Sequence, residues 1–184
     1  MFKQSPRFIT AMLLSLSLVC ATAFAVPSTN AATIDEPFDF SLRTVDGGGV
    51  SSQMLRGDVV VLAFGASWLP LSRAQVQGVQ KLADEFGPRD VRVYWVSTDS
   101  ESAKSKNYAT DEQLRAFARK NGLKVAVLRD PEGALFKQFG VAQNQLPSVV
   151  ILDKSGGVAE RIGGLNPEAD LVAQLSARLN LLLQ

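Results

Sequence analysis

The amino-acid sequence predicts an α/β fold in which a central mixed β-sheet is flanked by helices on both faces. Residues 59–64, 91–97 and 148–152 form short apolar runs rich in β-branched side chains, the composition of strands buried on both faces. Stretches with apolar residues at helical spacing lie between these runs, and a hairpin and a helix end the chain. Strands that alternate with helices are typical of a sheet covered on both sides.

The predicted domain begins with a β-hairpin. Its strands are expected at residues 38–43 and 50–54, on either side of Asp46-Gly47-Gly48-Gly49. Glycines readily adopt the positive φ angles that a tight hairpin turn requires. The same glycines could form a phosphate-binding loop, but no Lys-Ser/Thr pair or further spaced glycine follows them, so the pattern favours the turn.

Two helices of the predicted domain have boundaries that can be read from the sequence. Apolar residues at helical spacing extend over residues 73–86, and Gly87-Pro88 ends the helix. A second helix over residues 111–120 is expected to begin with a capping box formed by Thr110 and Gln113. Both patterns are amphipathic, so each helix is expected to pack one face on the sheet.

The C-terminal part of the domain is expected to supply the last strands and a long helix. Asn166 is the expected N-cap of that helix and Pro167 its first residue, a position that readily accepts proline. The elements predicted here are a strand at residues 125–128, a short helix at 133–139, a hairpin of strands 148–152 and 158–162, and the last helix at 167–182.

The first 25 residues have the pattern of a secretory signal peptide. Lys3 and Arg7 are their only charges, residues 8–19 are apolar, and Ala23-Phe24-Ala25 is a small-x-small cleavage site. We expect export to a bacterial periplasm or the extracellular space, with no membrane insertion after cleavage. The alternative is an uncleaved inner-membrane anchor, because residues 8–26 are uncharged and close to the length that spans a membrane.

The rest of the chain divides into a lead-in and one domain. Residues 26–36 are small and polar without periodicity, which predicts a flexible segment. Residues 37–184 have the length of a single domain of ordinary size. No internal repeat or low-complexity tract suggests a further division.

The composition excludes many classes of functional site. The only cysteine, Cys20, lies in the predicted signal, and the chain has no histidine. The mature chain would therefore lack disulfides, thiolates, histidine-based triads and most zinc sites, and the sequence indicates no cofactor or metal. Without Lys3 and Arg7, 17 basic residues would face 18 acidic ones, a balance that gives no electrostatic footprint for nucleic acid.

Acidic residues are concentrated after the predicted strand 91–97. They could be acid–base groups or a calcium loop, but their spacing does not match an EF-hand and lysines lie among them. We therefore expect a solvated loop. The residues concerned are Asp99, Glu101, Asp111 and Glu112, with Lys104 and Lys106 among them.

Two separated motifs resemble those of a known family. The first is Ala66-Ser67-Trp68-Leu69-Pro70-Leu71-Ser72-Arg73, after strand 57–64, and the second is the segment 140–153, which contains Leu146-Pro147. In order and surroundings they resemble the TlpA/ResA-like branch of the thioredoxin superfamily, redoxins related to AhpC-TSA, from about residue 37 onward. The resemblance implies a thioredoxin fold with an N-terminal hairpin, a helix-strand insertion, and a cis Pro147 that faces the Trp68–Ser72 turn.

The resemblance also implies a Cys-x-x-Cys pair, and this chain departs from it at both positions. Leu69 and Ser72 stand where the family has its cysteines, and neither can cycle between thiol and disulfide, so dithiol exchange is not expected. A serine nucleophile needs an adjacent general base, and none lies at a recognisable spacing. We expect the Ser72 hydroxyl to bond to its own helix backbone. Arg73 matches the basic residue that often follows the family motif, or is a surface charge.

The peptide-binding features implied by the resemblance remain in this chain. Thioredoxin-like sites bind extended peptides at the cis-proline loop beside an exposed tryptophan. We expect an apolar patch that binds an extended polypeptide or an envelope protein, unless Leu69 and Leu71 pack inward and fill the groove. The candidate binding residues are Trp68, Leu69, Pro70, Leu71, Leu146 and Pro147.

Two other functions stay open at this stage. The chain could be an oxidoreductase or antioxidant protein of the thioredoxin/peroxiredoxin family that acts only with the cysteines of a partner. It could also be a structural domain of an envelope complex. Fold alone does not choose among these functions, because function resides in the site.

Overall fold

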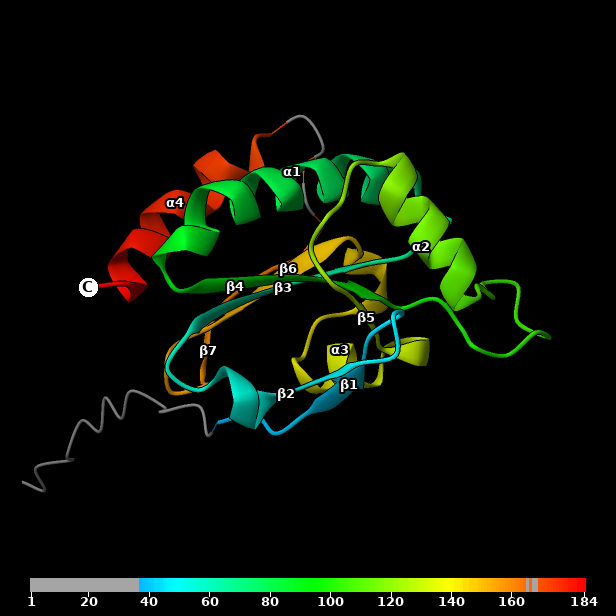
Figure 1. Cartoon of the computed structure of the whole chain (residues 1–184), viewed down its shortest axis with the longest axis horizontal. Coiled ribbons are helices and arrows are strands. Elements are labelled where there is room, and N and C mark those ends of the chain that lie inside the picture. Colours follow the sequence, from blue (N-terminus) through cyan, green and yellow to red (C-terminus); the bar gives the residue numbers. More distant parts are fainter. Residues whose placement is uncertain (1–36, 165, 167–168) are drawn as a thin grey trace, which may run out of the picture. The chain divides into compact units, whose positions relative to one another are not determined.

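The computed structural model describes residues 37–184, except residues 165 and 167–168. The predicted signal peptide and lead-in lie outside the described residues. A two-stranded hairpin accompanies a five-stranded sheet of order β5-β4-β3-β6-β7 (Figure 1). Among the described residues, no helix combines the length and apolarity needed to cross a membrane. The strands are β1 (Ser41–Arg43), β2 (Gly49–Ser51), β3 (Val59–Gly65), β4 (Val91–Ser97), β5 (Val127–Arg129), β6 (Ser148–Leu152) and β7 (Val158–Ile162), and the α-helices are α1 (Pro70–Phe86), α2 (Asp111–Lys120), α3 (Ala134–Gln138) and α4 (Leu171–Leu182).

Strand β3 lies at the centre of the sheet, as its uninterrupted apolar sequence predicts. All seven of its residues are buried. It runs parallel to β4 on one side and antiparallel to β6 on the other, so that Val61 lies opposite Val93 and Ile151. Because β5 is parallel to β4 and β7 is antiparallel to β6, the sheet is mixed, which confirms the predicted fold class.

Helices cover both faces of this sheet. Helices α1, α2 and α4 lie over one face, and α3 and the β1–β2 hairpin lie over the other (Figure 1). Successive side chains of a strand point to opposite faces. Val61 therefore belongs to the same core cluster as Val76 and Leu175, whereas its neighbour Leu62 belongs to the cluster of Phe136 on the other face. This double burial explains why β3 contains no polar side chain.

Helix α1 begins earlier than its apolar periodicity predicts. Leu69 is the N-cap and Pro70 the first helical residue, a position that suits a residue with a fixed φ angle and no N–H. The turn predicted over residues 68–72 is therefore shorter than expected. Leu71 and Ser72 belong to the first turn of the helix, and Ser72 faces the protein interior.

Helix α4 begins later than predicted. Asp170 is its N-cap, and the Oδ1 atom accepts a hydrogen bond from the backbone N–H of Val172 at 2.9 Å, so the prediction of Asn166 as the cap is wrong. The predicted role of Pro167 lies outside the described residues. The first residue of the helix, Leu171, packs closely on α1, because a Cβ atom on Gly78 would lie only 2.9 Å from Leu171 Cβ.

The hairpin keeps its predicted turn but has a shorter second strand. Gly47 has a φ angle of 91°, which glycine adopts without strain. β2 ends at Ser51, and Ser52–Leu55 forms a 3-10 helix that directs Leu55 into the core. A continued strand would not bury this leucine, which is why the strand predicted to residue 54 ends early.

The remaining helices and strands follow the sequence closely. α2 has its predicted bounds, and its capping box is present: Thr110 Oγ1 accepts from the Gln113 backbone N–H at 3.1 Å, and Gln113 Oε1 accepts from the Thr110 backbone N–H at 2.8 Å. β5 begins later than predicted, and α3 is shorter than predicted at both ends. Such shifts are ordinary for element ends read from sequence.

Candidate functional site

The turn between β3 and α1, together with the first turn of α1, carries the two positions where the family resemblance implies cysteines. Leu69 caps α1 without a side-chain hydrogen bond. Ser72 is fully buried, and its Oγ accepts a hydrogen bond from the backbone N–H of Ala66 at 3.1 Å. The Ser72 hydroxyl thus bonds across the turn rather than to its own helix backbone as expected, because it points inward toward the end of β3. A hydroxyl buried in this way is not placed to attack a ligand.

Asp99, just beyond the end of β4, anchors the same turn. Its carboxylate accepts hydrogen bonds from the backbone N–H and the hydroxyl of Ser67, each at 2.9 Å, and from the hydroxyl of Ser97 at 2.7 Å. Only 1% of Asp99 is exposed, so the prediction of a solvated side chain is wrong for this residue. A buried carboxylate requires such donors. Asp99 therefore ties the motif turn to the neighbouring strand.

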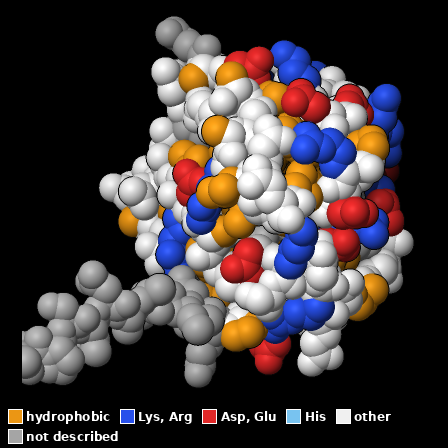
Figure 2. All heavy atoms as spheres, turned by 90° about the vertical axis from the view of Figure 1, so that its left-hand side faces the viewer, with side chains coloured by type: hydrophobic (Ala, Val, Ile, Leu, Met, Phe, Trp, Pro, Cys, Tyr) orange, Lys and Arg blue, Asp and Glu red, His pale blue; other side chains and the backbone are white. Residues whose placement is uncertain are grey.

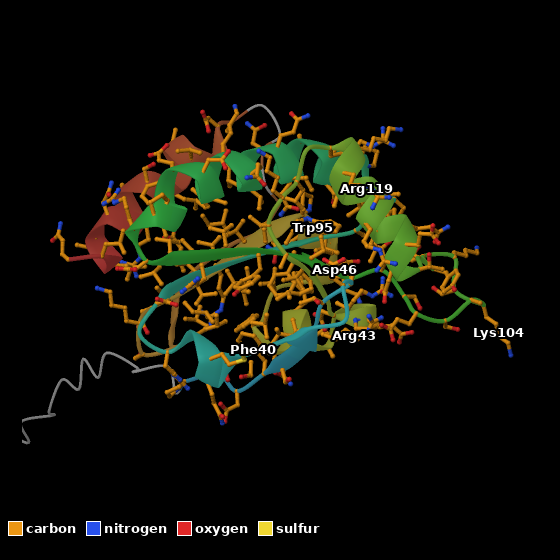
Figure 3. The ribbon with its side chains drawn as sticks, viewed as in Figure 1. Phe40, Arg43, Asp46, Trp95, Lys104 and Arg119 are labelled. Atoms are coloured by element: carbon orange, nitrogen blue, oxygen red, sulfur yellow. The ribbon has the colours of Figure 1, made fainter. Side chains whose placement is uncertain are left out.

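Gln75 holds the underside of the motif to three strands. From α1, its Nε2 donates to the carbonyl of Phe64 in β3 at 3.1 Å and to the carbonyl of Ser148 in β6 at 2.9 Å. Its Oε1 accepts from the indole N–H of Trp95 in β4 at 3.1 Å, and Trp95 lies between the sheet and the helices in Figure 3. Gly65 makes room for this arrangement, because a Cβ there would lie 2.7 Å from Gln75 Oε1.

Sequence reasoning missed the roles of Gln75 and Ser67. A signal for Gln75 was present, because it lies three residues after Ser72 and next to Val76 on the buried stripe of α1. A polar side chain on an apolar stripe needs a buried partner. For Ser67 no local signal exists, since its partner Asp99 lies 32 residues away in the sequence.

Residues 146 and 147 reach the motif from a distant part of the sequence. The Leu146–Pro147 peptide bond is cis. Pro147 is buried and Leu146 is half-buried. The next residue, Ser148, has a buried hydroxyl that lacks a hydrogen-bond partner among the described residues. Leu146 shares a hollow with Leu69, and Pro147 shares another with Leu71, so the structure brings the two predicted motifs together.

The larger hollow beside the motif has a volume of about 550 Å³. Trp68, Leu69 and Leu146 contribute apolar groups to its lining. Glu132 and Lys137 contribute a carboxylate and an ammonium group on another part of the lining. Most of the other lining residues are uncharged polar residues: a threonine, two serines, two asparagines and a glutamine. The hollow therefore offers both apolar surface and hydrogen-bonding groups to a ligand.

The smaller hollow has a volume of about 270 Å³ and lies between α1 and α4. Leu71 and Pro147 line it on the side of the motif. Gln77 on α1 and Gln174 on α4 also line it. Its lining is thus richer in carboxamides than in large apolar groups.

The predicted binding residues differ in their exposure. Trp68 is 53% exposed and Leu71 is 41% exposed, so Leu71 does not pack into the core as the alternative prediction supposed. Leu69 is half-buried and lines the larger hollow. Pro70 is exposed and lines neither hollow, and Arg73 is also exposed on α1. The end of the domain that faces left in Figure 1 has a different surface: Figure 2 shows charges of both signs there among scattered apolar side chains.

Other acidic residues of the predicted loop form a charge cluster. Arg43 of β1 contacts Glu101 and donates to Asp111 Oδ2 at 2.7 Å, and the buried Arg129 Nε lies 3.4 Å from Glu101 Oε1. Hydrogen bonds from Arg43 hold the pKa of Asp111 below its usual range. Lys104 points away from the domain in Figure 3. Within residues 37–184 as described, no three Asp, Glu, His or Cys side chains are grouped as a metal site requires.

Comparison with known proteins places this geometry in a family. Residues 34–161 match the AhpC/TSA family. Thioredoxin-like protein YneN from Bacillus subtilis is 30% identical over 122 residues. That match covers 66% of this chain and 66% of the relative, so the chain spans about two thirds of the relative's length.

Solved structures share the fold at lower identity. A protein from Chlorobium tepidum described as thiol:disulfide interchange protein DsbE is 24% identical with a TM-score of 0.67, covering 82% of this chain and 96% of that one. A secreted Mycobacterium tuberculosis disulfide oxidoreductase is 20% identical with a TM-score of 0.61, covering 78% of this chain and 96% of that one. The predicted thioredoxin fold is confirmed. Together with the match over residues 34–161, this establishes that the chain belongs to the AhpC/TSA family of the thioredoxin superfamily.

Proposed function

We propose that this protein is a binding module that holds an extended polypeptide in the groove between Trp68 and Pro147 and performs no dithiol exchange. The observation that carries the proposal is the apolar, partly exposed surface next to the two positions where the family resemblance implies a reactive pair. Trp68 and Leu71 are each about half exposed, and Leu69 and Leu146 line the hollow of about 550 Å³. Apolar side chains gathered beside a cleft are typical of a binding surface.

The available atoms support a function without dithiol chemistry. Residues 37–184 contain no cysteine. Leu69 has no ionisable group, and the Ser72 hydroxyl is buried against the backbone N–H of Ala66. Cys20 supplies one sulfur atom, whereas a dithiol cycle requires two. We therefore do not assign the family's redox reaction to this protein.

The backbone of Leu146 and the side chain of Trp68 favour a polypeptide ligand over a small compact one. The backbone N–H of Leu146 makes a hydrogen bond of 3.4 Å to the carbonyl of Gln143, which is longer than the usual range for such bonds. Backbone groups held this weakly can pair with an added extended strand, while neighbouring pockets accept its side chains. Trp68 adds a large apolar surface that loses little entropy on binding.

We also propose that the protein acts after export. The signal-like residues 1–25 support this part of the proposal. The Mycobacterium tuberculosis relative by fold is itself described as secreted. A polypeptide partner would then be an exported or envelope protein.

A photo-crosslinking amino acid placed at Leu69 in living cells tests the binding role. We expect a polypeptide adduct, identified by mass spectrometry, that is lost when Trp68→Ala is introduced in the same chain. The matched control carries the crosslinker at Met54, which is 69% exposed and lines neither hollow. The same adducts from both positions, or none from Leu69 in folded exported protein, would contradict the proposal.

A reductase assay tests the chemical part separately. With dithiothreitol as electron source, insulin disulfides should be reduced no faster with the purified protein than with dithiothreitol alone. The protein cannot form the mixed disulfide and then resolve it. If the protein reduces insulin faster than dithiothreitol alone, and Cys20→Ser does so too, the site reacts by a route outside dithiol exchange.

A further inference from the structure

We infer that the smaller hollow, between α1 and α4, is a second subsite that binds the main chain of the same polypeptide through glutamine carboxamides. This inference rests on the proposed function and extends it, because it assigns a ligand chemistry to a surface outside the Trp68 groove. The two glutamines, Gln77 and Gln174, lie on helices that are distant in sequence, α1 and α4, and the lining also includes Pro147 and residues just before α4. The smaller hollow would set the path of the bound chain beyond Pro147.

The two hollows are separated by the two motif segments. Leu69 lines the larger hollow, and Leu71, two residues later, lines the smaller one. In the same way, Leu146 lines the larger hollow and Pro147 lines the smaller one. A polypeptide that crosses Leu146–Pro147 from the Trp68 side therefore reaches the smaller hollow next.

The chemistry of the smaller hollow matches a peptide backbone. The side-chain carboxamides of Gln77 and Gln174 make no hydrogen bond with any other described residue, and both residues are exposed. Each carboxamide offers two N–H donors and one carbonyl acceptor, the complement of a peptide C=O and N–H. Gln75 does not take part, because its amide is already bound to Phe64, Ser148 and Trp95.

The charged groups of the smaller hollow are less suited than the carboxamides to determine which ligand binds. Asp170 already accepts a hydrogen bond from the Val172 N–H as the cap of α4. Lys81 also lines the hollow and could attract an acidic side chain. Because the two charges have opposite sign, they favour neither an acidic nor a basic ligand as a whole. The neutral carboxamides therefore indicate a backbone contact that tolerates different sequences.

Peptide display on the purified protein tests this assignment. A random library of 12-residue peptides, each about 40 Å long when extended, is selected on the wild type and depleted on Trp68→Ala. The dissociation constants of selected peptides are then measured by fluorescence anisotropy. We expect the double variant Gln77→Ala/Gln174→Ala to bind about tenfold more weakly, because two hydrogen bonds are lost.

A matched control removes two glutamines elsewhere. Gln53 and Gln138 are exposed and line neither hollow, so Gln53→Ala/Gln138→Ala should change the dissociation constant by less than about twofold. Thermal unfolding of both double variants should match the wild type, since the replaced side chains are exposed. This comparison separates a loss of contact from a loss of fold.

The outcomes distinguish the subsite from the groove itself. Peptides that require Trp68 but bind Gln77→Ala/Gln174→Ala with unchanged affinity would overturn the second subsite and leave the proposed function intact. Loss of binding in Lys81→Ala alone would also overturn it, because an acidic side chain would then be the ligand. If no selected peptide depends on Trp68, the proposed function fails and the subsite fails with it.

Discussion

The two sides of the motif turn differ in their chemistry. On the buried side, Ser72, Gln75 and Asp99 make hydrogen bonds of 2.7 to 3.1 Å that tie the turn to the sheet. On the outer side, Trp68 and Leu71 present apolar surface to solvent. The outer side thus has no reactive thiol, while the buried side holds the turn in place. The geometry of the turn is therefore held by buried hydrogen bonds that require no thiol.

The largest effect is expected on the buried side, at Gly65. In Gly65→Ala the new methyl group would lie 2.7 Å from Gln75 Oε1, 2.8 Å from Ser72 Oγ and 3.0 Å from Trp95 Nε1. We expect the free energy of unfolding to fall by about 3 kcal/mol, because a packed hydrogen-bonded network must move. Urea unfolding measures the change.

Gly87→Ala is the matched control for this substitution. Gly87 has a φ angle of −54°, and a Cβ there would meet no atom within 4 Å. Its unfolding free energy should stay within about 0.5 kcal/mol of the wild type. Equal losses at both glycines would mean that the buried network adds nothing specific to the turn.

A smaller loss is expected when the turn is detached from β4. Asp99→Ala leaves the N–H and hydroxyl of Ser67 without their acceptor. We expect the free energy of unfolding to fall by about 2 kcal/mol. Amide hydrogen exchange should become faster than in the wild type at Ser67 but not at the centre of β3. Glu85→Ala, at an exposed position on α1, is the control. Unchanged exchange at Ser67 in Asp99→Ala would show that the turn holds its shape by other means.

The smallest effect on stability is expected on the outer side. Trp68→Ala should lower the free energy of unfolding by less than about 1 kcal/mol, since 53% of the residue is already in solvent. Differential scanning calorimetry measures the change. A loss as large as that of Gly65→Ala would break the comparison, because Trp68 would then support the fold rather than present a surface.

Much of the fold could be predicted from local patterns. The apolar runs identified β3, β4 and β6, and the Thr110/Gln113 pair located the start of α2. Local patterns failed where two signals compete, as at α4, where both Asn166 and Asp170 are residue types that cap helices and the structure uses Asp170. They also failed for Asp99, because an acidic side chain gives no local sign that it is buried.

The residues of the candidate site could be predicted, but the direction in which their side chains point could not. The family resemblance implied that Pro147 faces Trp68, and the structure brings both motifs to the same two hollows. Pattern reasoning did not show that Leu71 faces solvent and Ser72 the interior, since the predicted helix began after both residues. The start of α1 at Pro70 determines which side each occupies.

The sequence by itself determined the chemistry that this domain lacks, because residue type decides whether a sulfur or an imidazole is present at all. It also determined which segments are buried strands, since a strand covered on both faces must be apolar throughout. Only the tertiary structure decided how the site is supported and where it opens. Gln75 bonds to a residue 73 positions away, and the smaller hollow exists because α1 and α4 pack side by side. Contacts between distant segments depend on how the whole chain packs, and no local pattern encodes them.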